Sequence, residues 1–128
     1  MAAVFRIKEG ETSATVTVMP LGGDGGGLRA NVDRWRGQLN LPPVKDENEL
    51  QSLVRSLTVS GRKASYVDLA SPDKSSDKGP LRILAVIIPH GDQTWFVKMT
   101  GPASLIEKHK STFEQFVKSL SFEGGNRG

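Results

Sequence analysis

The chain has 128 residues, of which 37% are hydrophobic and 24% are charged, a composition typical of one folded domain. Its 17 basic and 14 acidic residues give a net charge of +3 and are spread along the sequence, which argues against nucleic acid as the partner, because such binding needs a clustered basic patch. The lack of cysteine excludes disulfides, a thiol nucleophile and cysteine-ligated metals, and two histidines are too few for a histidine-rich metal site.

The N-terminal part of the chain predicts a hairpin followed by a helix. Residues 2–8 and 13–19 are β-rich segments separated by a loop that contains Gly10, and they predict two antiparallel strands. Glycine then fills five of the six positions from 22 to 27, which excludes a helix or a stable strand there. An apolar stripe at helical spacing predicts the helix over 28–39: Leu28, Val32, Trp35 and Leu39.

The middle of the chain predicts a short helix and a second hairpin. Asp46 and Glu49 resemble a capping box that starts the helix, and the pattern changes from helix to strand near Ser56. Four apolar residues mark the inner side of this helix: Leu50, Leu53, Val54 and Leu57. The hairpin turns at 60–61 and returns over 64–69, and the polar residues 71–80 predict an exposed, mobile loop.

The C-terminal part predicts two strands and the longest helix. Residues 81–89 form a nearly continuous apolar run, typical of a central strand that is covered on both faces. Residues 90–93 predict a tight turn and residues 94–100 its partner strand. The helix over 102–120 has one broad apolar stripe: Leu105, Ile106, His109, Phe113, Phe116, Val117 and Leu120.

This order of elements predicts the fold class. Neighbouring strands are joined by short turns, so we expect an α+β protein with a mostly antiparallel, twisted sheet in an α/β/α sandwich. We expect a single domain over 1–128, with its core at about 3–122 and a disordered tail at 123–128. We also expect Trp35, Trp95 and Phe113 to belong to the core.

The glycine-rich segment is the first candidate for binding. The backbone of Gly25, Gly26 and Gly27 precedes a helix, and free N–H groups at such a point can hold an anion. The segment lacks the Lys-Ser or Lys-Thr of a phosphate-binding loop. A flexible connector is therefore the favoured interpretation, and a mobile loop that folds over a partner is an intermediate one.

Charged residues near this segment allow two interpretations. Arg29 and Arg34, with Arg36, lie on the helix that follows the glycines. They form either a solvated face with local ion pairs, which is the simpler interpretation, or a face that binds carboxylates or phosphates.

The histidines give no catalytic motif. His90 precedes Gly91 and Asp92 in a turn, and Asp92 could orient it, but no G-x-S-x-G motif supplies an activated serine. We interpret His90 as a turn residue and His109 as a residue at the edge of the core. No residues are predicted to be catalytic or to bind a metal or a cofactor.

Two segments resemble a known family. Residues 95–102 read W-F-x-K-x-T-G-P and lead into a long amphipathic helix with two phenylalanines, and residues 25–43 read GGGLRANVDRWRGQLNLPP. Over about 3–122 the chain resembles an uncharacterised bacterial branch of the PsbP-like superfamily, which includes PsbP of photosystem II, the Ran-binding Mog protein and DcrB. The resemblance implies the PsbP-like fold and a place in the bacterial cell envelope, although we find neither an export signal nor a membrane-spanning segment.

Two functions remain open at this point. The favoured one is a non-catalytic accessory or binding domain that acts on a protein partner through its surface loops, at 21–27 and 71–79, without a large enclosed cavity. The alternative is a small domain that binds an anionic ligand, or a weak enzyme, using loop 22–27, Arg29, Arg34 and His90. The oligomeric state cannot be inferred from these patterns.

Overall fold

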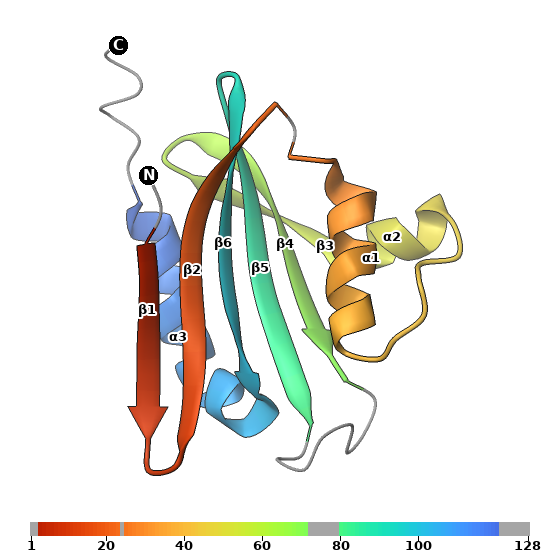
Figure 1. Ribbon diagram of the computed structural model, residues 1–128. Helices are drawn as coiled ribbons and strands as arrows, with labels where there is room; N and C mark the ends of the chain where they lie inside the picture. The colour runs from red at the N-terminus through yellow and green to blue at the C-terminus, as the bar shows by residue number, and fades with distance from the viewer. Residues whose placement is uncertain (1–2, 24, 72–79, 121–128) are drawn as a thin grey trace.

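The computed structural model describes residues 3–23, 25–71 and 80–120, which form six strands and three helices (Figure 1). In chain order they are β1 (Ala3–Glu9), β2 (Thr12–Gly22), α1 (Leu28–Gln38), α2 (Glu47–Leu53), β3 (Val54–Val59), β4 (Arg62–Ala70), β5 (Leu81–His90), β6 (Gln93–Pro102) and α3 (Ala103–Ser119). The predicted order of elements is confirmed. Residues 72–79 of the predicted loop at 71–80, and the predicted tail at 123–128, lie outside the described residues.

The six strands form one sheet in the order β1-β2-β6-β5-β4-β3, and every neighbouring pair is antiparallel. Three hairpins supply the strands, and the N-terminal hairpin joins the sheet where β2 pairs with β6, with Thr15 opposite Thr100. The α+β class and the antiparallel sheet are therefore confirmed.

One face of the sheet packs against α3. Alternate residues of β2, β4, β5 and β6 point to this side and meet the apolar stripe of the helix. Phe113 is only 3% exposed, and the ring of Tyr66 of β4 lies near it, tilted by 42°, at a ring-centroid distance of 6.4 Å. The remaining buried side chains include Val16, Leu84, Val86, Ile88, Val97, Met99, Ile106 and Val117.

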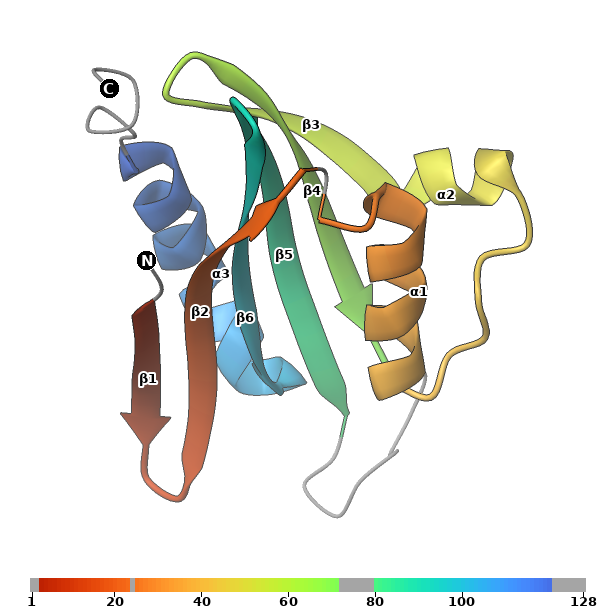
Figure 2. The same cartoon turned by 45° about the horizontal axis from the view of Figure 1, so that its top comes forward.

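The other face packs against α1 and α2, but only over part of its width. Trp35 of α1 is 1% exposed and contacts Phe96 of β6 edge to face, at a centroid distance of 6.4 Å. The buried residues on this side include Val32, Leu39, Val44, Leu50, Val67, Leu69, Ile83, Ala85 and Ile87. In Figures 1 and 2 these two helices lie beside β4 and β3, away from β1 and β2.

Three predicted boundaries were wrong. The second helix ends at Leu53, because Val54 pairs with Val67 and begins strand β3. Strand β2 continues to Gly22, because it follows β6 as far as Gln93. Pro102 is the residue before helix α3 and not its first residue, since its ψ of 138° is extended.

Candidate functional site

One part of the sheet is left without a helix. The register places Val4 opposite Thr17 and Thr17 opposite Lys98, so their side chains share the face that α1 covers farther along the sheet. Apart from Trp35 of α1, which approaches Lys98 at its margin, none of the described helices packs on this part. We call it the open face and define it by nine residues: Val4, Arg6, Lys8, Thr15, Thr17, Met19, Leu21, Lys98 and Thr100.

The open face is basic. Arg6 and Lys8 are exposed on β1, Lys98 lies on β6, and the exposed Arg34 of α1 adds a fourth cation at its margin. The alternation of β1 sends the acidic residue of the strand to the opposite side. There Glu9 binds Lys108 of α3 at 2.8 Å and approaches Nε2 of His109 at 2.9 Å, and these hydrogen bonds lower the pKa of its carboxyl.

Two cations approach the same buried ring at the margin of the open face. The guanidinium carbon of Arg34 lies 5.8 Å from the centroid of the Trp35 ring, and Nζ of Lys98 lies 5.9 Å from it. Burial lowers the pKa of Lys98, and repulsion from Arg34 lowers it further. No ion pair joins either cation to a carboxylate in the described part of the chain.

The glycine-rich segment is anchored at several points. Gly23 donates its N–H to the carbonyl of Asp92 at 2.8 Å, and the hydroxyl of Thr94 donates to the carbonyl of Gly23 at 2.7 Å. The side-chain amide of Asn31 donates to the carbonyls of Gly25 and Gly27. The segment is thereby fixed to the tip of the β5–β6 hairpin, near His90, which is the last residue of β5 and not part of the turn as predicted.

Gly25 lies directly on a core ring. A Cβ atom at this position would come within 2.6 Å of the Phe96 ring, and its φ of 65° is unfavourable for other residues. Next to it, an open groove of about 430 Å³ lies between the glycine-rich segment and the β5–β6 hairpin. Its lining includes Gly23, Gly27, Gly91, Gln93 and Thr94.

The structure separates the two predicted arginines. Arg29 donates from its guanidinium to the carbonyl of Val44 at 3.2 Å, whereas Arg34 faces Trp35 and Lys98. Arg29 and Arg34 are five positions apart on α1, a rotation of about 140° beyond one full turn, so their side chains point to different sides of the helix. Arg36 is buried and donates to the carbonyl of Pro42 at 2.7 Å, so it holds the segment after α1 in place.

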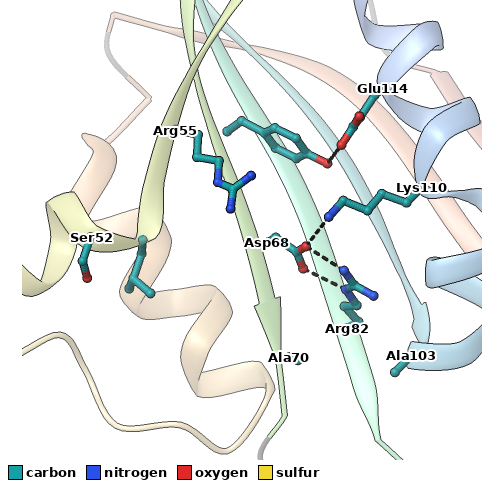
Figure 3. A pocket seen from close by; sticks show the side chains of 10 residues that line it. Ser52, Arg55, Asp68, Ala70, Arg82, Ala103, Lys110 and Glu114 are labelled. Atoms are coloured by element: carbon teal, nitrogen blue, oxygen red, sulfur yellow. Dashed lines mark hydrogen bonds and ion pairs between the residues drawn. The ribbon is translucent and has the colours of Figure 1, made fainter.

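A second site, which was not predicted above, is a polar groove of about 400 Å³ between α3 and strands β3 to β5 (Figure 3). Asp68 of β4 accepts hydrogen bonds from Arg82 of β5 at 2.7 and 2.8 Å and from Lys110 of α3 at 3.0 Å. Arg82 also binds Glu107 at 2.6 Å. Burial alone would raise the pKa of Asp68, but these hydrogen bonds outweigh it and lower the pKa.

The rest of the polar groove is also paired across elements. The hydroxyl of Tyr66 donates to Glu114 at 2.8 Å. Burial raises the pKa of the tyrosine, and the hydrogen bond to this carboxylate raises it further. Arg55 of β3 lies at its outer wall and is exposed. A sequence signal did exist, because Asp68 and Arg82 each stand between two apolar residues of their strands. The network attaches α3 to the sheet. Each of its acidic groups, Asp68, Glu107 and Glu114, is already bonded to a residue of the same network.

A small apolar groove of about 240 Å³ lies between the N-terminal hairpin and α3. Phe5 of β1 is 48% exposed there and contacts Phe116 edge to face at 5.9 Å. His109 also lines this groove, in agreement with its predicted place at the edge of the core.

The described residues contain neither a metal-binding cluster nor a helix that could span a membrane. Within ranges 3–23, 25–71 and 80–120, no three or more His, Asp or Glu side chains are grouped so that they could hold a metal ion. Among the helices of the same ranges, none has both the length and the apolar character needed to cross a membrane.

Comparisons with known proteins give one informative likeness. No family model matches the chain, and no curated protein sequence matches it. A similar solved structure is that of protein PA94 from Pseudomonas aeruginosa, described as a protein of unknown function and a candidate regulator. The two share 15% sequence identity and superpose with a TM-score of 0.59 over 94% of this chain and 82% of that chain. At this level of identity the likeness is one of fold alone.

Proposed function

We propose that the chain is a non-catalytic binding domain of PsbP-like type, and that it docks a protein partner on the open face and on the adjoining glycine-rich segment. The observation that carries the proposal is the contrast within a single sheet face. The strands under α1 are apolar and buried, whereas the neighbouring strands β1 and β2 present cations and hydroxyl groups to solvent.

The chemistry of this surface favours a partner with acidic side chains. Arg6, Lys8, Lys98 and Arg34 all lie on or beside the open face, so an acidic partner would gain charge complementarity over several contacts. Exposed apolar side chains accompany them, since Val4 is 63% and Met19 is 44% exposed. A mixture of apolar contacts and charged groups is typical of protein–protein interfaces.

Site-specific photocrosslinking tests this proposal. A photoreactive residue at Met19 reports on the open face, and the same residue at Ser111 reports on the outer side of α3. We expect cross-links to a protein from Met19 and none from Ser111. Arg6→Glu combined with Lys8→Glu should abolish the cross-link, and added salt should weaken it.

Three results would contradict the proposal. Cross-links from Ser111 alone would move the interface to α3. A cross-link from Met19 that persists in the Arg6→Glu, Lys8→Glu variant would show that these two cations do not contribute to binding. Cross-links to nucleic acid in place of protein would identify a different class of partner.

A further inference from the structure

Lys98 is a half-buried cation whose surroundings, as far as they are described, contain no negative charge. It lies on β6 between Thr17 of β2 and Ala85 of β5, and its ammonium group stands 5.9 Å from the centre of the Trp35 ring. A charge in such a position loses part of its hydration, and the indole face compensates only part of that loss. Among the described residues, the charged group that acts on it is the guanidinium of Arg34.

Repulsion from the positive charge of Arg34 further destabilises the charged form of Lys98. Both cations lie within 6 Å of the same ring, and each would be more stable farther from the other. Two positive groups beside one ring, with no counter-ion among the described residues, are typical of sites whose negative charge comes with the ligand.

Hydroxyl groups complete the donor set. Thr17 lies directly opposite Lys98, and Thr100 is two residues farther along β6 on the same face. Both side chains are partly exposed. An ammonium, a guanidinium and a hydroxyl together offer several hydrogen-bond donors to a single group of oxygen atoms.

We propose that Lys98, Arg34 and Thr17 form a binding site for one doubly charged oxyanion of the phosphate type. A dianion matches the two cations, and the guanidinium can bind two of its oxygens side by side. This inference deepens the proposed function and rests on it, because the phosphate group would be carried by the partner that docks on the open face.

Trp35 provides an optical signal for the test. Trp95→Phe leaves Trp35 as the sole tryptophan, and inorganic phosphate is titrated slightly above neutral pH, with chloride holding the ionic strength constant. We expect a saturable change in Trp35 fluorescence, a rise in the pKa of Lys98 followed by NMR, and much weaker binding of acetate. The pKa should rise because a bound anion favours the charged ammonium.

Substitutions locate the site. Lys98→Gln and Arg34→Gln should each weaken phosphate binding by about ten-fold or more. Lys98→Arg should retain binding, which shows that loss in Lys98→Gln does not come from misfolding. Lys63→Gln and Arg55→Gln are matched controls on other strands, and they should leave the affinity unchanged.

The outcomes separate this inference from the proposed function. If phosphate gives no saturable signal, or affects Lys98→Gln as strongly as the unsubstituted site, the oxyanion site is overturned, even where the Met19 cross-link persists. Equal affinity for acetate overturns the assignment to a dianion. If phosphate binds as expected and the Met19 cross-link is absent, the site stands and the docking of a protein partner is overturned.

Discussion

The two sides of the β1–β2 hairpin differ sharply although they come from the same residues in alternation. On the α3 side, Ala14 and Val16 are buried and Ile7 packs against the core. On the other side, Arg6, Thr15 and Thr17 face outward with no helix among the described ones above them. A strand therefore needs only half of its residues to be held in the sheet, and the other half is free to serve recognition.

Strand β5 shows what happens where both sides are covered. Six consecutive residues, from 83 to 88, are buried, because α3 covers one side and α1 with α2 covers the other. The open face is therefore not a general property of this sheet. It arises because helix α1 packs over the strands next to β6 and leaves the hairpin uncovered.

The largest expected effect concerns the covered side. Phe113→Ala should lower the free energy of unfolding by about 3–5 kcal/mol, because it leaves a cavity beneath α3. Thr17→Ala, its counterpart on the open face, should change stability by less than about 0.5 kcal/mol. Urea denaturation measures both. Equal effects of the two substitutions would remove the distinction between the sides.

A smaller effect is expected where the glycine-rich segment meets the sheet. Gly25→Ala should cost about 1–3 kcal/mol, because the new methyl group meets Phe96 and the backbone has a positive φ. Gly23→Ala is the matched control, since it has a similar φ of 61° but nothing within 4 Å of the added atom. The difference between their melting temperatures isolates the contact with Phe96. No difference would mean that the segment is not seated on the ring.

The ion network of the polar groove should make stability depend on pH. The folded pKa of Asp68 lies below its unfolded value, so its contribution is complete above the unfolded pKa and is lost as pH falls through the folded one. Asp68→Asn should therefore cost about 1–2 kcal/mol near neutral pH and progressively less in acid. Urea denaturation at several pH values checks this. A cost that stays constant with pH would show that the carboxylate charge is not involved.

The smallest effect has the opposite sign and concerns the open face. Lys98→Met should stabilise the protein by about 0.5 kcal/mol near neutral pH, because it removes a half-buried charge that forms no ion pair with the described residues. The folded pKa of Lys98 lies below its unfolded value, so the advantage of methionine should shrink as pH rises through the folded pKa. Thermal melts of both forms at neutral and alkaline pH measure this. Destabilisation by Lys98→Met would indicate that the lysine has a structural role.

The sequence predicted local features well and distant pairings poorly. Alternation in 13–19, the helical stripe around Trp35 and the apolar run at 81–89 depend on neighbours in the chain, and the type of each element was predicted correctly, although β2 extends farther than predicted. The end of α2 was misplaced because pairing of Val54 with strand β4 overrides a helical pattern.

The candidate site was found only in part for the same reason. Arg34 was named as a candidate binding residue, but Lys98 was overlooked because its neighbours come from β2 and α1, far away in the sequence. The network of Asp68, Arg82 and Lys110 likewise joins three separate elements. Spacing along a chain does not reveal which charges meet across a sheet.

The strand order β1-β2-β6 also determines when the N-terminal hairpin can join the sheet during synthesis on the ribosome. The first hairpin to be synthesised can join the sheet only after the last strand has emerged, because β6 is the partner that β2 requires. Until then Ile7 and Val16 lack their permanent cover of β6 and α3. Long-range pairings of this kind form late and slowly, and a nascent chain is most prone to aggregate while it waits for them. The cations on the other side of the hairpin would keep such waiting chains apart through mutual repulsion.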